Sequence, residues 1–225
     1  MIDDLARRGV DRVVHGGDLA LVGCQGAEAV DRIRELGWPG VIGNVDELLW
    51  RPELRAVQER KTPRQRELLR LLFDKYAPAT NTALGDERIA WLQALPREHR
   101  EDDVLVVHAS PGDLWSAPMP DADDAELRTT YGESEAGVVV YGHIHRPFVR
   151  GLERFTVANS GSVGSPFDGD PRASYLLIED GDVEVVRIDY DIEREAALLL
   201  RSGYPDAERI AAMRRDGRFV RPAPS

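Results

Sequence analysis

The sequence is poor in cysteine, in positive charge and in long apolar runs. Cys24 is the single cysteine among 225 residues, so no disulfide can form within the chain and a reducing compartment is expected. Lys and Arg number 29 against 40 Asp and Glu, and the net charge of -11 disfavours nucleic-acid or anionic-membrane partners and counts against a nuclease. Apolar runs such as Val104 to Val107 are much shorter than a membrane span, and the first residues lack a signal-peptide core. We therefore predict a cytoplasmic protein.

Strand and helix patterns alternate along the chain. Ala27 to Leu36 has apolar residues at helical spacing. Short apolar runs predict strands at Val10 to His15, Val41 to Ile42, Val104 to Val107, Val138 to Tyr141, Phe155 to Ala158, Ala173 to Ile178 and Val183 to Tyr190. The later strands follow one another closely, with a turn at Asp180-Gly181, which predicts antiparallel pairing. This order predicts an α/β fold in four layers, a two-sheet β-sandwich flanked by helices.

The composition also predicts how the chain is divided. Residues 1–190 are expected to form one domain with a helical insert at about 46–95, which Pro63 interrupts. Residues 112–135 are expected to be an acidic loop. Residues 191–225 are expected to be a C-terminal helical extension that ends in a loose tail.

Polar side chains follow four of the apolar runs. Asp18, Asn44, His108, His143 and His145 come directly after these runs or within a few residues of their ends. Ligands gather at the carboxyl ends of strands in open α/β sheets, and the glycines before Asp18, Asn44 and His143 would let the backbone turn sharply into one cavity. Mixed imidazole, carboxylate and amide ligands suit Mn, Fe, Zn or Ni better than Ca or Mg.

Each of these residues also has a plain structural explanation. A Gly-Asp pair is usually a turn, and a single histidine at the end of a strand, such as His108, is more often hydrogen-bonded in a core. His143 and His145, two residues apart, would project to one side of a strand and could form only a polar strand edge. Their occurrence together and in this order favours the metal site.

The pattern resembles the calcineurin-like metallophosphoesterase superfamily. Its motifs run Asp-x-His, Gly-Asp, Gly-Asn-His-Asp, a lone His after a strand and Gly-His-x-His, and the chain has the last four in order. Residues 159–166, Asn-Ser-Gly-Ser-Val-Gly-Ser-Pro, and residues 170–174, Asp-Pro-Arg-Ala-Ser, resemble segments of the small bacterial phosphodiesterase branch. The resemblance covers about residues 5–190.

The resemblance implies a role for each ligand. Asp18 would bridge two divalent transition metals, with Mn favoured, while Asn44, His108 and His143 complete the second site and His145 binds the first. Asp18, Asn44 and His108 would then be catalytic. The implied activity is hydrolysis of a small phosphate ester by a metal-activated hydroxide at a dinuclear site.

The chain departs from the family pattern at the first motif, because no Asp-x-His precedes Asp18. The first metal would keep Asp18 and His145 alone, so this site is expected to be weak. The favoured explanation is that the natural gene begins upstream and the chain starts about one strand and part of a helix late. The alternative is a degenerate, non-catalytic member of the same fold that acts as a binding or scaffold protein.

The second departure is Val45, which stands where the family has the His of Gly-Asn-His-Asp. The loss of a general acid would favour phosphodiesters over alkyl monoesters. Asp46 has a plain interpretation as the N-cap of the next helix. The natural substrate is left open, as is a homo-oligomer formed through the C-terminal helices.

Overall fold

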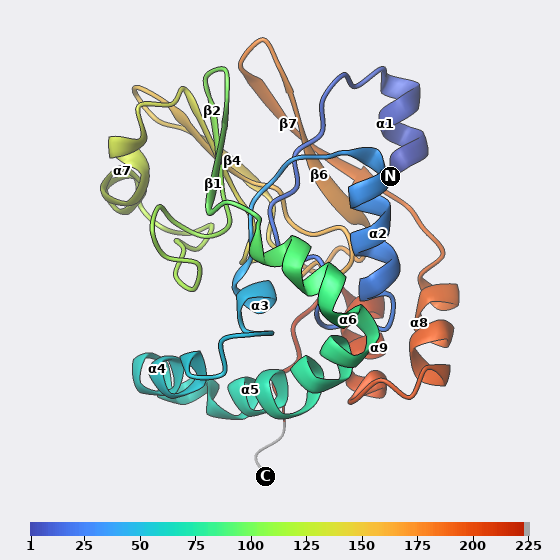
Figure 1. Ribbon diagram of the computed structural model, residues 1–225. Coiled ribbons are helices and arrows are strands. Elements are labelled where there is room, and N and C mark those ends of the chain that lie inside the picture. Colours follow the sequence, from blue (N-terminus) through green and yellow to red (C-terminus); the bar gives the residue numbers. More distant parts are fainter. Residues whose placement is uncertain (223–225) are drawn as a thin grey trace.

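The structure, a computed structural model, describes residues 1–222 (Figure 1). The helices are α1 (Ile2–Arg8), α2 (Gly26–Leu36), α3 (Asn44–Glu47), α4 (Leu54–Lys61), η1 (Pro63–Gln65), α5 (Arg66–Leu71), η2 (Leu72–Tyr76), α6 (Ala77–Gln93), α7 (Asp124–Tyr131), η3 (Gly132–Ser134), α8 (Ile192–Arg201) and α9 (Ala207–Asp216). The strands are β1 (Glu98–Glu101), β2 (Val104–Val107), β3 (Val138–Tyr141), β4 (Phe148–Gly151), β5 (Thr156–Asn159), β6 (Ala173–Glu179) and β7 (Asp182–Ile188).

The larger sheet has five strands in the order β1-β2-β3-β5-β4. Its three central strands are parallel, with Val104 opposite Val138 and Val138 opposite Thr156. The edge strands β1 and β4 run antiparallel to their neighbours. Because the carboxyl ends of parallel strands meet at one edge, the residues after β2 and β3 are brought together there.

Two edge strands were not predicted. Strand β1 is the polar run Glu-His-Arg-Glu, whose burial alternates because only one of its faces packs on the protein. Strand β4 lies between β3 and β5 in the sequence and runs antiparallel to both. It brings the chain back to the end of the sheet where β3 begins, so that β5 can pair with β3 in parallel. The predicted antiparallel pairing of the later strands is therefore wrong for β5, which pairs in parallel with β3 and lies in a different sheet from β6 and β7.

The second sheet is the hairpin β6-β7, which is antiparallel as predicted. Its turn is the expected Asp180-Gly181 pair, and both residues have positive φ, 51° and 86°. This conformation suits the twist of a two-residue hairpin. Helices flank the two sheets (Figure 1), which confirms the predicted α/β architecture with two sheets.

The strands predicted at 10–15 and 41–42 are absent, apart from one parallel bridge between His15 and Gly40. The His15 N–H donates to the Pro39 carbonyl at 3.0 Å, and the His15 carbonyl accepts the Val41 N–H at 3.1 Å. The next amide, that of Ile42, donates to Pro96 rather than continuing the pair. A single bridge is not a ladder, so neither segment forms a strand.

Helix α7 interrupts the segment 112–135, which was predicted to be a loop. The Asp123 carboxylate caps the helix by accepting the Glu126 N–H at 2.8 Å. Leu127 and Tyr131, four residues apart, are buried in a cluster with sheet residues such as Val139. Burial against the sheet therefore stabilises a helix whose sequence has weak apolar periodicity.

A second core is built from helices. Buried residues of α2, α6, α8 and α9 pack together with Ala20 and Leu48 from the loops. The segment 46–95 is helical, with the predicted break at Pro63 and another at Gly85, whose φ is 68°. Two helices lie within 191–225, and the end of the predicted tail, 223–225, lies outside the described residues. The domain boundaries remain predictions.

Among residues 1–222, no helix combines the length and the hydrophobicity needed to cross a bilayer. The cytoplasmic location remains a prediction.

Candidate metal centre

Asp18 lies in a sharp turn that a second, buried carboxylate shapes. Gly17 and Asp18 both have positive φ, 87° and 57°. The fully buried Asp46 accepts backbone N–H groups from Asp18 at 2.8 Å, from Leu19 at 2.9 Å and from Gly43 at 3.1 Å. One carboxylate therefore joins the loop of Asp18 to the start of α3, where Asn44 lies.

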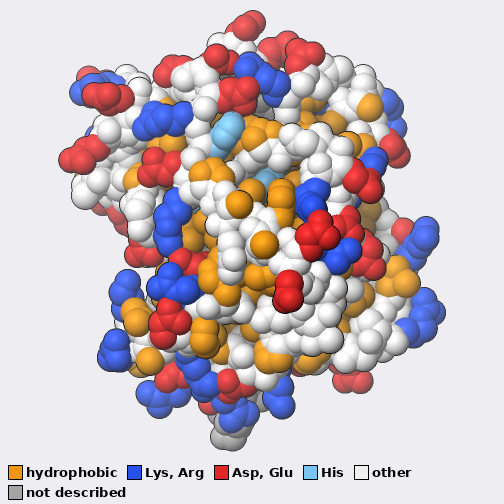
Figure 2. Space-filling view, in the orientation of Figure 1, with side chains coloured by type: hydrophobic (Ala, Val, Ile, Leu, Met, Phe, Trp, Pro, Cys, Tyr) orange, Lys and Arg blue, Asp and Glu red, His pale blue; other side chains and the backbone are white. Residues whose placement is uncertain are grey.

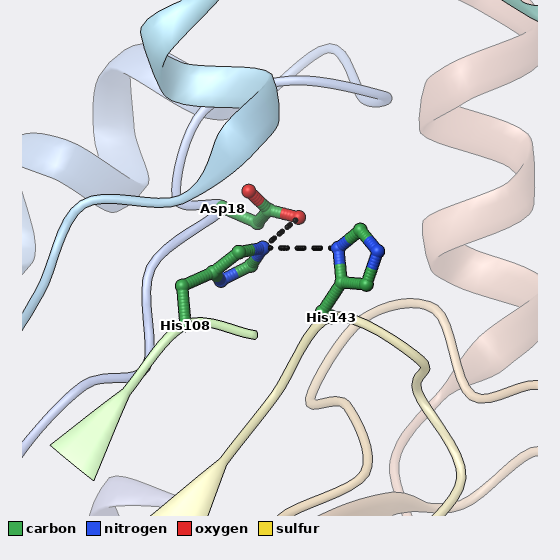
Figure 3. Close-up of side chains that lie close together, drawn as sticks. All are labelled: Asp18, His108 and His143. Carbon is green, nitrogen blue, oxygen red and sulfur yellow. Dashed lines mark hydrogen bonds and ion pairs between the residues drawn. The ribbon is translucent and has the colours of Figure 1, made fainter. Parts of the chain in front are cut away.

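Four side chains from separate segments converge at this point. His108 Nε2 lies 2.9 Å from Asn44 Oδ1 and 3.4 Å from Asp18 Oδ2. His143 Nδ1 lies 3.0 Å from the same Asn44 oxygen and 3.3 Å from His108 Nε2. Figure 3 shows Asp18 and His143 directed toward the same nitrogen of His108. The structure thus brings together four of the five predicted ligands.

A hydrogen bond at the far side of the His108 ring indicates which of its nitrogens carries a proton. His108 Nδ1 lies 2.8 Å from the Gly16 carbonyl, so this nitrogen donates and Nε2 presents a lone pair. His143 Nδ1 lies beside the Asn44 amide oxygen, to which it can donate when protonated, and it presents a lone pair when the proton is on Nε2. Two imidazole nitrogens, an amide oxygen and a carboxylate oxygen therefore meet at one point, a mixed set of ligand atoms that suits a transition-metal cation.

Burial sets the protonation states around the cluster. It lowers the pKa of His108, and it lowers the pKa of His143 to about 3, with further lowering by the neighbouring histidines. Burial also raises the pKa of Asp18, a shift that the nearby His145 opposes. Neutral imidazole is the form that binds a metal, so the site is prepared for a cation rather than for protons.

His145 lies outside this tight group, although it is close enough to act on the pKa of Asp18. Asp18, His108 and His143 have ligand atoms within 4.8 Å of one another, whereas His145 is not part of that set. Its Nδ1 lies 2.7 Å from the Ser165 carbonyl, and its ring stacks on Phe167 at 4.7 Å. His143 and His145 follow the end of β3 with φ of 57° and 56°, so the predicted projection from a regular strand is wrong.

The three glycines do not share the role that was predicted for them. Gly17 has the expected positive φ, but Gly43 has a φ of -99° that any residue can adopt. Gly43 is required for space, because a Cβ there would overlap the Asp18 carboxylate and backbone nitrogen. The strained backbone after Gly142 belongs to His143 itself, as is common at functional sites.

The same residues carry a family likeness that extends along most of the chain. Residues 1–182 match the calcineurin-like phosphoesterase superfamily domain. The chain belongs to this superfamily. Members of the calcineurin-like phosphoesterase superfamily generally bind divalent metals, in agreement with the donor atoms that converge here.

Two curated relatives come from methanogenic archaea. An uncharacterized protein of Methanocaldococcus jannaschii is 26% identical over 234 residues, covering 92% of this chain and 87% of the relative. A probable metallophosphoesterase of Methanothermobacter thermautotrophicus is 37% identical over 83 residues, or 37% of this chain and 45% of the relative.

Solved structures show the calcineurin-like fold over nearly the whole chain. A metallophosphoesterase from Sphaerobacter thermophilus has a TM-score of 0.74 and 25% identity, covering 96% of this chain and 93% of that one. A hypothetical protein from Pyrococcus horikoshii has a TM-score of 0.76 and 16% identity, covering 97% and 91%, and supports the fold alone.

Asp46 has a larger structural role than the helix cap predicted from the sequence. The predicted N-cap role is wrong, because Gly43 is the N-cap of α3 and Asp46 is the third residue of the helix. The Asp46 carboxylate accepts the Gly43 N–H, but its main partners are the amides after Gly17. The closeness of Asp46 to Asn44 in a calcineurin-like motif was the available signal. The His15 ring lies beside that of Trp91, with a centroid separation of 6.3 Å.

Proposed function

We propose that this calcineurin-like protein is a metal-dependent phosphodiesterase that hydrolyses small phosphate esters at a dinuclear site. The supporting observation is the convergence of lone-pair atoms from Asp18, Asn44, His108 and His143. Asp18 and His143 are half-buried and His108 is 1% exposed. The cluster therefore extends from the buried core to the solvent-accessible surface. On the face that Figure 2 shows, acidic and basic side chains are interspersed around apolar surface.

Each residue has a distinct task in this proposal. His108 and His143 hold neutral lone pairs toward the cation, and Asn44 offers its amide oxygen to the same cation. Asp18 would be shared with a second cation that His145 would also hold, and His145 is close enough to lower the pKa of Asp18. Bound divalent transition metals, with Mn²⁺ favoured, supply an activated water and neutralise charge on the phosphoryl group.

The preference for diesters follows from Val45. Its backbone N–H donates to Asp18 Oδ1 at 3.1 Å, but its side chain has no proton to give to a leaving group. Hydrolysis is slowed least for esters whose leaving groups depart as stable anions and need no proton. Aryl diesters are therefore expected to turn over faster than alkyl monoesters.

The test is Mn²⁺-dependent hydrolysis of bis(4-nitrophenyl) phosphate, compared with glycerol 2-phosphate. Asp18→Asn and His108→Gln should abolish diester hydrolysis, whereas His99→Gln, a matched change outside the cluster, should retain it. Equal rates on the two esters would contradict the diester preference. Tight Mn²⁺ binding with no hydrolysis of any ester would instead support the scaffold protein of the same fold.

A further inference from the structure

The loop that follows Asp18 contains a strained residue. Val22 has a φ of 68°, in the left-handed region that β-branched residues almost never occupy. Strain of this kind persists only where the surrounding structure enforces it, and it gathers near functional sites. What enforces the conformation of Val22 therefore bears on the position of Asp18, four residues earlier.

Side chains from the C-terminal helices hold both backbone groups of Val22. Its N–H donates to the Tyr204 hydroxyl at 3.3 Å, and its carbonyl accepts Nη2 of Arg214 at 3.1 Å. Tyr204 lies in the turn between α8 and α9, and Arg214 lies on α9. Both residues are outside 1–182, the part of the chain that matches the family domain. Figure 1 shows α9 beside the early part of the chain.

The two holding side chains are themselves fixed. Arg214 is 7% exposed and forms an ion pair with Glu195 of α8. The Tyr204 hydroxyl also lies 3.2 Å from Thr80 Oγ1 on α6. A Cβ at Gly23 would come within 2.8 Å of the Arg214 guanidinium, so this group packs directly on the loop. The contact between Arg214 and the loop is therefore buried and closely packed.

The opposite end of the loop is anchored by Asp46, which accepts the N–H groups of Leu19 and Ala20. The Ala20 carbonyl packs against Gly26 at the start of α2 with no room for a Cβ. Because residues 19, 20 and 26 are held in this way, Val22 cannot change to a negative φ without displacing the residues before it. That segment carries Asp18.

We propose that Tyr204 and Arg214 are positioning residues that hold Asp18 in place for the metal by fixing Val22 in its strained conformation. The C-terminal helices then belong to the architecture of the metal site. The connection to metal binding rests on the proposed function, whereas the connection to the shape of the loop does not.

The first experiment measures hydrogen exchange of backbone amides in metal-free Arg214→Met. The matched control is Arg215→Gln, the next residue of α9, which pairs with Glu193 of the same partner helix. In Arg214→Met the amides of residues 19, 20 and 22 should exchange about tenfold faster, with the sheet amides of residues 106 and 139 unchanged. An unchanged loop, or equal acceleration at every amide, would overturn the proposal.

Tyr204→Phe removes a single hydroxyl and decides the question should Arg214→Met not fold. Tyr204→Phe should accelerate hydrogen exchange at the amides of residues 19, 20 and 22 while the sheet amides stay protected. An unchanged exchange rate at residue 22 would count against the proposal.

Mn²⁺ affinity, measured by calorimetry, links the loop to the site. Arg214→Met should weaken binding by about 10- to 100-fold, and Arg215→Gln should leave it unaltered. Adding Val22→Gly should recover part of the loss, because glycine adopts this φ without strain. A double variant that binds no better than Arg214→Met would contradict the role of the strain. Should the wild type bind no Mn²⁺, the proposed function fails, and the exchange data still decide whether the helices hold the loop.

Discussion

The carboxylate of Asp46 accepts the backbone N–H of Asp18 at 2.8 Å across 28 residues of sequence. Asp46 is fully buried and binds Leu19 and Gly43 through the same two oxygens. The donors that it collects come from two loops with no strand pairing beyond the bridge of His15 with Gly40. The position of Asp18 therefore depends on a buried side chain where a sheet ladder is absent.

Asp46→Asn should destabilise the metal-free protein by roughly 2 kcal/mol, because the new amide group presents a donor to backbone donors in a buried place. Urea unfolding in the presence of a chelator measures the change. The control is Asp103→Asn, an exposed carboxylate that accepts the Gly137 N–H, where about 0.5 kcal/mol or less is expected. Similar losses for the two variants would show that Asp46 is not a structural centre.

Gly43→Ala should prevent metal binding while the fold is retained. The φ of -99° suits alanine, so the effect arises from the methyl group, which would overlap the Asp18 carboxylate. The control is Gly132→Ala, at a φ of -66° and with nothing within 4 Å of the new Cβ. Calorimetric titration with Mn²⁺ should give a normal isotherm for Gly132→Ala and none for Gly43→Ala. Normal binding by both would mean that Asp18 is free to move aside.

Mn²⁺ should stabilise the wild-type protein. At a free metal concentration 100 times Kd, one site adds about 2.7 kcal/mol, which corresponds to a rise of about 5 to 10 °C in the thermal midpoint. The rise should disappear in Asp18→Asn and on addition of EDTA. A midpoint that rises equally in Asp18→Asn would place the metal elsewhere on the protein.

Stability should fall between pH 7 and pH 5 partly because of His15. Burial lowers its pKa from 6.5 to about 4, and no hydrogen bond to either ring nitrogen compensates. The unfolded chain binds a proton below pH 6.5 and the folded chain only below about 4, so this contribution is complete above 6.5 and is lost as the pH falls toward 4. The loss by pH 5 is about 2 kcal/mol.

The comparison of His15→Gln with the wild type in urea, at pH 7 and pH 5 without metal, isolates this contribution from that of the other histidines. The variant should lose less stability than the wild type between the two values. Identical losses would mean that the His15 ring takes up a proton without unfolding.

Local pattern predicted much of the fold. Strands β2 and β3, the helical segment around Pro63 and the Asp180-Gly181 hairpin turn are confirmed because each depends on residues close together in sequence. Helix α7 was missed because its stability comes from burying Leu127 and Tyr131 on a distant sheet. The pairing of β3 with β5 also could not be predicted without β4, a short edge strand with weak alternation.

The sequence alone indicated the superfamily and the identity of the candidate ligands, because a metal site requires side chains of particular types and these occur here in the order of the family's motifs. Only the tertiary structure decided that Asn44 and two imidazoles meet at one point, that His145 lies apart from them, and that Asp46 holds the turn of Asp18. Those outcomes depend on contacts between segments far apart in the chain. Such contacts arise from packing, which no local pattern of residues encodes.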